Sequence, residues 1–270
     1  MESTAERTER RPIRVSVVVV SQQQVELLRA TLTALARREK PEESEIIVVD
    51  CGSQDGSARL DDEFESITLL RLQRNFGWTK AVNIATRTSK GEYLLLLPNG
   101  VEVAPDTIGR LLAGIESDPE VGAVCPAGDC YALPQAGERE LRAVGAAEAE
   151  YPFDQPVLLP RIAIVSMNYL PDAYGQFYGD LDLFYKMRGA GKRILVLADL
   201  VLSRSRAPQT LIDEEMAEAD QISGLASFYS KNYGFGAWLR FLLGQSLRAL
   251  FGFRLGLTGK LLSGAKVDGL

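Results

Sequence analysis

The sequence predicts an α/β protein with a mostly parallel central sheet, and two features of residues 14–206 carry this prediction. Short apolar segments alternate with segments of helical periodicity over residues 15–125, which is typical of parallel sheets with right-handed crossovers. Polar side chains follow the ends of the predicted strands, where ligands bind in such sheets. We expect residues 1–13 to form a disordered arm and residues 207–270 a helical, basic extension.

Five strands are predicted in the first half of the chain by short runs rich in Val, Ile and Leu. Val15–Val20 is apolar on both faces, as expected of a central strand with helices on both sides. Glu45–Asp50 ends at a carboxylate, and Glu92–Leu97 leads into the loop Pro98-Asn99-Gly100. The remaining two are predicted at Ile67–Leu72 and Val121–Cys125.

Helices are predicted between these strands. Val25, Leu28, Leu32 and Leu35 recur at helical spacing within the segment Gln24–Arg37. Further elements are helices at Trp78–Thr88 and at Pro105–Ile115, where a proline lies in the first turn, and a capped helical turn at Ser53–Arg59.

The second half of the chain is less regular. Residues 126–160 are rich in Gly, Ala, Pro and Glu and predict loops, and Leu158–Val165 predicts a strand. Gly179–Arg188 predicts a helix that begins with acidic residues, which the helix dipole favours. Arg193–Leu197 predicts another strand, and the chain is expected to be helical from Ile212 onward.

Composition excludes several classes of function. The net charge of −6 argues against nucleic acid as the main partner. The chain has no histidine, the commonest general base and zinc ligand. Three cysteines without a CxxC pair fit a reducing cytoplasm, and the N-terminus lacks the apolar core of a signal peptide.

Four motifs occur in a characteristic order: Asp50-Cys-Gly-Ser-Gln-Asp-Gly-Ser57, Arg74-Asn-Phe-Gly-Trp78 with Asn83, Leu94–Gly100, and Tyr178-Gly-Asp-Leu-Asp-Leu183. In this order and spacing they resemble the family-two glycosyltransferases of GT-A fold, and by pattern their rhamnosyltransferase-like branch, over residues 14–206. The resemblance implies an inverting enzyme that moves a sugar from a nucleotide-diphosphate sugar to a cell-surface glycan or lipid-linked acceptor. Such an enzyme would serve cell-wall or polysaccharide biosynthesis at the cytoplasmic face of the inner membrane.

Seven residues are expected to bind the donor. Asp50 can accept from a base N–H or a ribose hydroxyl, or it caps the turn with Ser53. Asn83 can bond the base or a neighbouring backbone carbonyl. Arg74 and Lys80 can meet phosphate oxygens, although Lys80 also fits a solvated basic face. The full set is Asp50, Arg74, Lys80, Asn83, Asn99, Gly100 and Arg204. We expect Asp55 to be a turn residue and Trp78 to belong to the core.

The loop after the fourth strand departs from the family pattern. Relatives usually place there an Asp that binds Mg²⁺ or Mn²⁺, since hard cations prefer carboxylate oxygen, whereas this chain has Pro98-Asn99-Gly100. Glu102 is a weak alternative ligand. Relatives often carry His near residues 203–206, where Arg204 or Arg206 could supply positive charge instead. Three states stay open: metal-free catalysis, weak metal binding, or a non-catalytic relative.

Asp180 matches the family's catalytic base, which takes the proton of the attacking acceptor hydroxyl. Asp182 matches a structural acid at the start of the helix. Relatives often have Glu before the base, and this chain has Gly179.

The segment 235–266 combines Leu and aromatic residues with single cations. Peripheral docking on a membrane and packing on the catalytic domain or a second subunit are both open interpretations. Two rival functions are also open: a non-catalytic pseudo-glycosyltransferase that acts as a partner or scaffold, and, less well supported by the motifs, a nucleotidyltransferase.

Overall fold

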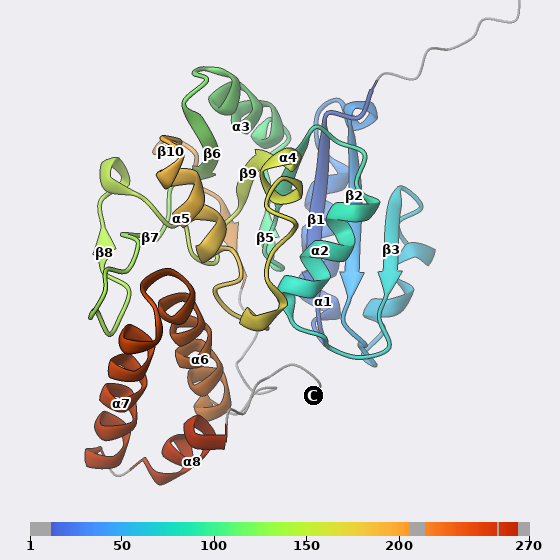
Figure 1. The fold of residues 1–270 in the computed structure, drawn as a ribbon. Coiled ribbons are helices and arrows are strands. Elements are labelled where there is room, and N and C mark those ends of the chain that lie inside the picture. Colours follow the sequence, from blue (N-terminus) through green and yellow to red (C-terminus); the bar gives the residue numbers. More distant parts are fainter. Residues whose placement is uncertain (1–11, 206–213, 253, 264–270) are drawn as a thin grey trace, which may run out of the picture.

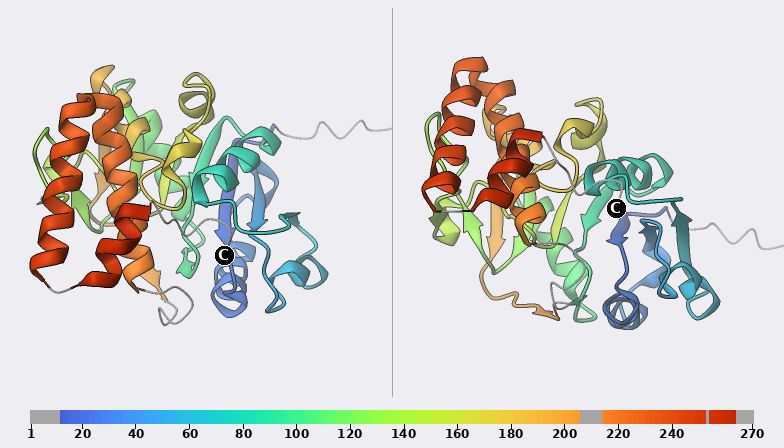
Figure 2. Two further views of the ribbon diagram at one scale, coloured as in Figure 1. Left: turned by 60° about the horizontal axis from the view of Figure 1, so that its bottom comes forward. Right: turned by 90° about the horizontal axis from the view of Figure 1, so that it is seen from below.

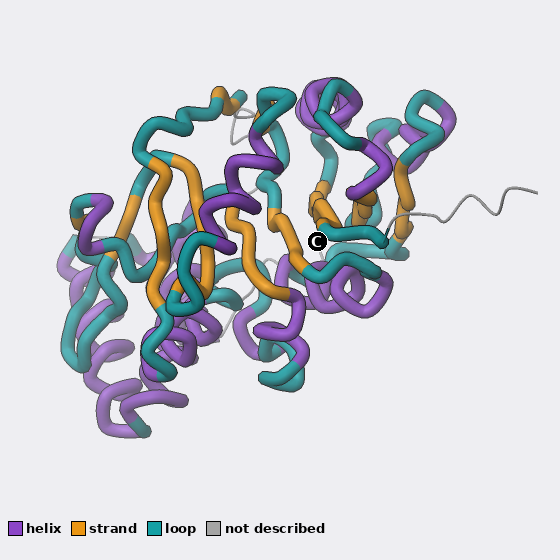
Figure 3. Tube along the Cα trace, turned by 90° about the horizontal axis from the view of Figure 1, so that it is seen from above, coloured by secondary structure: helices purple, strands orange, loops and turns teal. Residues whose placement is uncertain are grey.

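The computed structural model describes residues 12–205, 214–252 and 254–263, and residues 1–11 of the expected arm lie outside this range. A seven-stranded sheet has the order β10-β6-β9-β4-β1-β2-β3 and forms a row across the molecule (Figure 3). All neighbours are parallel except β9, which runs antiparallel to β4 and β6. The strands are β1 (Val15–Ser21), β2 (Ser44–Asp50), β3 (Ile67–Arg71), β4 (Tyr93–Leu96), β6 (Val121–Pro126), β9 (Val157–Pro160) and β10 (Arg193–Leu197).

Helices cover both faces of the sheet because alternate residues of its buried strands point into two separate cores. Val18, Ile47 and Leu94 pack on one side with α2, α4 and α5, and Val17 and Ile46 pack on the other with α1 and α3. The two layers flank the sheet in Figure 1. These helices are α1 (Val25–Ala36), α2 (Trp78–Thr88), α3 (Thr107–Glu116), α4 (Arg161–Val165) and α5 (Leu181–Gly189).

The strand order reverses direction at β1. The chain adds β2 and β3 on one side of β1 and then places β4 on the other side. The carboxyl ends of β1 and β4 therefore border the position at which open α/β sheets bind ligands. The α/β class with a mostly parallel sheet is thus confirmed.

Two predicted elements differ from the structure. The segment Leu158–Val165 is not one strand, because β9 ends at Pro160 and α4 begins at Arg161. The turn predicted at Ser53–Arg59 is a 3₁₀ helix at Ser57–Asp62. Asp55 bonds the backbone N–H groups of Ser57 and of Val25, the first residue of α1, so it orders two element starts at once.

Short elements complete the sheet's surroundings. The strand β5 (Val101–Glu102) pairs with β11 (Ser203–Arg204), and β7 (Cys130–Tyr131) pairs with β8 (Ala143–Val144). The remaining 3₁₀ helices are Pro41–Glu43, Ala146–Glu148 and Asp172–Tyr174.

The C-terminal part is helical as predicted, with α6 (Glu214–Tyr233), α7 (Phe235–Phe251) and α8 (Leu255–Ser263) packed side by side (Figure 2). Gly234, with φ of +82°, separates α6 from α7. Phe228 and Phe241 belong to the same core as α2 and α5, so these helices are continuous with the α/β part. Among the described residues, no helix is long and apolar enough to cross a membrane.

Candidate functional site

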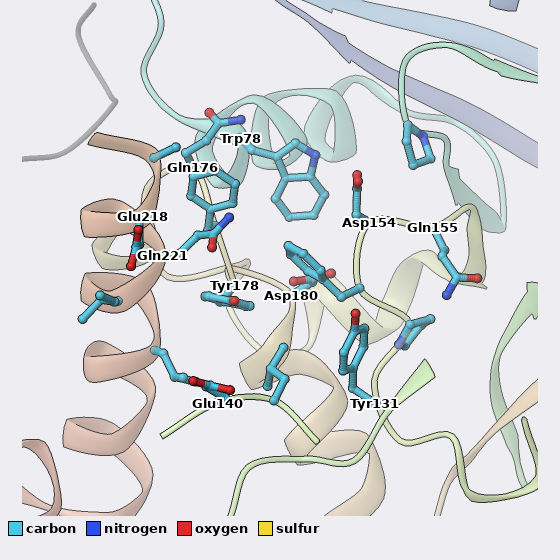
Figure 4. A pocket seen from close by; sticks show the side chains of 18 of the residues that line it. Trp78, Tyr131, Glu140, Asp154, Gln155, Gln176, Tyr178, Asp180, Glu218 and Gln221 are labelled. Atoms are coloured by element: carbon cyan, nitrogen blue, oxygen red, sulfur yellow. The ribbon is translucent and has the colours of Figure 1, made fainter. Parts of the chain in front are cut away.

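A cavity of about 1300 Å³ lies at the carboxyl ends of β1 and β4. Val18 and Val20 of β1 and residues 96–99, at and just beyond the end of β4, line it. In Figure 4, Asp180 lies near the centre, with Trp78 above it and Glu218 and Gln221 of α6 to its left. Pockets of this size and position are the usual binding sites of α/β folds.

Asp180 occupies the residue before α5, at the positive end of the helix dipole. Its Oδ1 accepts a hydrogen bond of 2.7 Å from the hydroxyl of Tyr151, which is fully buried. Burial raises the pKa of Asp180 to about 6, and the Tyr151 hydrogen bond partly opposes this rise. A carboxylate with this pKa at a cavity wall can hold or release a proton near neutral pH.

Aromatic rings surround this carboxylate. Phe153 stacks on Tyr178 with ring centroids 5.2 Å apart, and Tyr151 lies 5.8 Å from Phe153 and 5.7 Å from Phe184. Tyr178 has a φ of +62°, a conformation that L-residues rarely adopt. The rings exclude water from one side of Asp180, which is the physical origin of its raised pKa.

Gly179 is packed against α2. A side chain at this position would collide with the hydroxyl of Thr79, which is buried and has no hydrogen-bond partner in the described structure. The Glu that relatives often carry before the base therefore has no room here.

Arg204 lines the same cavity and is paired with Asp154. Its two terminal nitrogens lie 2.8 and 3.0 Å from the two carboxylate oxygens of Asp154, a bidentate arrangement. Its Nε is buried and lacks a partner in the part of the chain that the structure describes. The guanidinium therefore keeps one unused donor beside the cavity. Arg206, the other predicted cation, lies outside the described residues.

The side chain of Asn99 holds the loop after β4 in place. Asn99 Nδ2 donates to Ser21 Oγ and Gln24 Oε1, both at 3.0 Å, and Asn99 lines the cavity. Gly100 has a φ of +83° and lies against the carbonyl of Ser205, so it shapes the loop and does not line the cavity. The strand pair β5–β11 thereby brings Arg204 beside the loop.

The donor set here does not fit a divalent cation. Asn99 offers a neutral amide that is already hydrogen-bonded, and Asp154 is engaged by Arg204. Glu102 is exposed on β5 and lies outside the cavity lining. Within the described ranges, no three carboxylate or thiol side chains converge as metal ligands. The reaction proposed below therefore involves neither Mg²⁺ nor Mn²⁺.

Asp50 lies at the end of β2 and is 1% exposed. Its Oδ2 accepts the backbone N–H of Ser53 at 3.1 Å, which matches the capping interpretation. Its Oδ1 is buried without a partner among the described residues, so one acceptor remains unused. Asp50 is outside the cavity lining, and its donor role stays a prediction.

Three other predicted donor residues lie apart from the cavity lining. Both ends of the Asn83 amide bond the backbone of Leu170, at 2.8 and 2.9 Å, which corresponds to the backbone alternative. Arg74 and Lys80 both lie over the ring of Phe76, at 4.8 and 4.9 Å from its centroid. The structure thus gathers Asn99, Asp180 and Arg204 at one cavity and leaves Asp50, Arg74, Lys80, Asn83, Gly100 and Glu102 outside its lining.

Asp182 is fully buried between two lysines. Lys231 of α6 lies 2.7 Å and Lys186 lies 3.2 Å from its Oδ2. Burial alone would raise the pKa of Asp182, but the two ammonium groups outweigh it and the pKa is lowered. This side chain joins α5 to α6, in line with the structural role expected of it.

Sequence reasoning missed the side chains that complete the site. Phe153 and Asp154 of the irregular region and Glu218 and Gln221 of α6 line the cavity, and Tyr151 of the irregular region bonds Asp180. The stretch 151–156 carries Tyr151 before its first proline and Phe153 and Asp154 between its two prolines, in a region otherwise rich in Gly and Ala. That contrast was the available signal. Trp78, expected in the core, also lines the cavity.

Together, the sheet order, the cavity at the β1–β4 ends and the carboxylate at the start of α5 have the arrangement of a GT-A fold. Residues 16–156 match the family model of glycosyl transferase family 2. The chain belongs to this family, and the resemblance seen in its motifs is confirmed at that level. The rhamnosyltransferase-like branch stays a prediction.

Curated relatives share the N-terminal part. An uncharacterized glycosyltransferase, YfnE of Bacillus subtilis, is 27% identical over 116 residues, which cover 42% of this chain and 29% of that protein. An undecaprenyl-phosphate 4-deoxy-4-formamido-L-arabinose transferase of Pseudomonas fluorescens is 33% identical over 101 residues, 36% of this chain and 29% of that protein. The chain spans between 13% and 39% of the lengths of the curated relatives that it matches.

Solved structures share the fold. The mannosyltransferase PcManGT of Pyrobaculum calidifontis, in complex with GDP-Man and Mn²⁺, has a TM-score of 0.64 at 18% identity, covering 94% of this chain and 75% of that one. TarS 1–349 of S. aureus in complex with UDP-GlcNAc has a TM-score of 0.59 at 16% identity, covering 80% of this chain and 66% of that one.

Proposed function

We propose that this protein is an inverting glycosyltransferase that uses a nucleotide-diphosphate sugar, with Asp180 as the general base. The observation that carries the proposal is the position of Asp180, on the wall of the cavity at the switch point of the sheet and with its pKa raised to about 6. In this proposal the Asp180 carboxylate takes the proton of an acceptor hydroxyl. The hydroxyl oxygen forms the new bond to the anomeric carbon as the bond to the diphosphate breaks.

The donor in this proposal lies over the carboxyl ends of β1 and β4, beside Asn99. Arg204 then faces the diphosphate, and its buried Nε offers a donor to a phosphate oxygen. Its pairing with Asp154 holds it beside the cavity until the more highly charged diphosphate competes for it. The bound nucleotides of the solved relatives support a UDP or GDP sugar as donor class.

The proposed acceptor is a glycan or a lipid-linked precursor on the cytoplasmic side, with peripheral membrane contact through residues 235–266. One curated relative is named for undecaprenyl phosphate, which supports a lipid-linked acceptor. All three cysteines are free thiols, which fits a reducing compartment. Residues 264–266 lie outside the described ranges. The proposal also divides the chain into a glycosyltransferase domain at residues 14–206 and a helical extension at residues 207–270.

A second candidate function is a non-catalytic partner of an active glycosyltransferase. The favouring observation is that Asn99 and Arg204 are already hydrogen-bonded within the protein, in a site without the usual metal-binding carboxylate. Such a protein would keep the fold and lose the reaction.

Transfer assays on the wild type and on an Asp180 variant distinguish the enzyme from the non-catalytic partner. Nucleotide release from a panel of UDP, dTDP and GDP sugars is measured with bacterial lipid extract or glycan as acceptor, for the wild type and Asp180→Asn. The enzyme proposal expects at least a roughly 100-fold loss of turnover in the variant with donor binding retained. Equal turnover in both proteins would remove Asp180 as base, and a wild type that binds no nucleotide would favour the non-catalytic partner.

A further inference from the structure

The outer side of α7 carries a continuous row of exposed apolar side chains. Its first five members recur every three or four residues, the sixth follows the fifth directly, and all are between 39% and 79% exposed. At 3.6 residues per turn this spacing places them on one side of the helix. We call this row the outer face of α7, and it consists of Phe235, Leu239, Leu243, Leu247, Leu250 and Phe251.

The opposite side of the same helix is fully used by the fold. Ala237, Phe241, Gln245 and Ala249 are buried and recur every four residues. Phe241, Gln245 and Ala249 also line the cavity. The outer face therefore contributes nothing to the internal packing, and an apolar surface of this length on a soluble-protein helix marks an interaction site.

Charge distinguishes among the partners that could cover this face. The sequence has no Asp or Glu between Asp220 and Asp268. Residues 221–270 carry six basic residues and one acidic residue, so with −6 overall the remaining chain carries −11. Arg240 is exposed, falls on the same side of α7 as the apolar row, and has no ion-pair partner among the described residues.

We propose that the outer face of α7 docks on an anionic lipid surface. Leu and Phe side chains would enter the interface, and Arg240 would meet the negative headgroups. A second copy of this chain fits less well, because two outer faces brought together would also bring together two Arg240 guanidinium groups, which have no ion-pair partner among the described residues, whereas Lys231, Arg248, Arg254 and Lys260 are paired with acids of other elements. The phenyl rings of Phe235 and Phe251 stand at the two ends of α7, so the whole helix length, about 26 Å at 1.5 Å per residue, lies along the surface.

This docking gives the cavity an orientation. Arg248 and Ala249 of α7 and Arg254 just beyond it line the cavity, and the other side of α7 would face lipid. Asp180 lines the same cavity. An acceptor anchored in the bilayer could then reach Asp180 along α7. The docking makes specific the peripheral membrane contact that is part of the proposed function, and the reach to an acceptor rests on that function.

The test uses the full chain and vesicles of phosphatidylcholine with or without phosphatidylglycerol in a flotation assay. The wild type is expected to float with anionic vesicles and roughly tenfold less with neutral ones. Leu243→Glu/Leu247→Glu is expected to lose vesicle binding by roughly tenfold or more, and Arg240→Gln to lose part of the preference for anionic lipid. Ile162→Glu is the matched control, because Ile162 is an apolar residue outside α7 and is 65% exposed, against 54% for Leu243 and 51% for Leu247.

Three results would overturn the docking proposal. The first is a wild type that does not bind anionic vesicles. The second is an Ile162→Glu control that loses as much vesicle binding as Leu243→Glu/Leu247→Glu. The third is a wild type that binds no vesicles and sediments as a dimer, while Leu243→Glu/Leu247→Glu sediments as a monomer. Nucleotide binding by the same preparations separates this proposal from the proposed function. Vesicle binding without nucleotide binding would leave the docking intact and remove the enzyme, and the reverse would remove only the docking.

Discussion

The hydroxyl of Tyr151 donates a 2.7 Å hydrogen bond to Oδ1 of Asp180 inside a ring of aromatic side chains. Burial, followed by the negative charge of Asp180, raises the pKa of Tyr151 well above its usual value, so the phenol stays protonated. The bond favours the ionised carboxylate, whereas burial disfavours it more strongly. Without the hydrogen bond from Tyr151, the pKa of Asp180 would therefore be higher than about 6.

Replacing Tyr151 with Phe is expected to raise the pKa of Asp180 further. The rising limb of kcat/KM against pH, expected near pH 6 in the wild type, then moves upward by about one pH unit. Tyr174→Phe is the matched control, since Tyr174 is buried and its hydroxyl has no hydrogen-bond partner in the described structure. An unchanged profile in Tyr151→Phe would show that the hydrogen bond does not tune the base.

Asp180→Asn is expected to stabilise the fold at neutral pH. Below pH 4 the carboxyl is protonated in both the folded and unfolded states, and between about pH 4 and 6 only the unfolded state ionises, so stability falls as pH rises. The variant escapes this penalty, which is on the order of 2 kcal/mol. Thermal unfolding at pH 4 and pH 8 measures it. A variant that is less stable than the wild type at pH 8 would contradict the prediction.

Arg204→Gln is expected to weaken binding of a nucleoside diphosphate by roughly 10- to 100-fold and binding of the bare nucleoside much less, because only the diphosphate meets the guanidinium. Asp154→Asn should act in the opposite direction, since it releases Arg204 from its bidentate partner. Arg110→Gln is the control, because Arg110 is likewise paired with an aspartate, Asp199, but lies outside the cavity lining. Calorimetric titration gives all three affinities, and equal losses in Arg204→Gln and Arg110→Gln would refute a specific role.

We expect the loop after β4 to tolerate an introduced carboxylate at residue 99 and not at residue 100. Gly100→Asp places a side chain at a φ of +83° and against the Ser205 carbonyl, so it should destabilise the fold by more than about 2 kcal/mol. Asn99→Asp keeps an ordinary backbone and should introduce Mn²⁺-dependent nucleotide binding. Denaturant unfolding and titration with Mn²⁺ test the pair. Equal stability of the two variants would contradict the role given to Gly100.

The sequence predicted the parts of the fold whose signal is local. The periodicity of Val25–Leu35 and the apolar run Val15–Val20 correspond to α1 and β1, since strand and helix patterns are read from neighbouring residues. The antiparallel direction of β9 and the break at Pro160 were not predictable in this way. Pairing of β9 with β4 and β6 is decided by packing over long sequence separations.

The candidate site follows the same division. Asp180 and Asn99 stand in recognisable motifs, and Arg204 stands where relatives often carry His. All three meet at one cavity, although their roles stay predictions. Asn83 sits in a motif too, but its amide bonds Leu170, a contact between residues 87 positions apart. Tyr151 and Asp154 come from a segment without periodicity, and only the folded chain shows that they contact Asp180 and Arg204.

The most direct test of the account is calorimetric titration of the purified protein with UDP, dTDP and GDP, each with and without Mn²⁺. The account predicts binding of at least one diphosphate that does not depend on Mn²⁺ and that Arg204→Gln abolishes or strongly weakens. Binding that requires Mn²⁺ would contradict the charge role given to Arg204. A folded protein that binds none of the three would contradict the donor site itself.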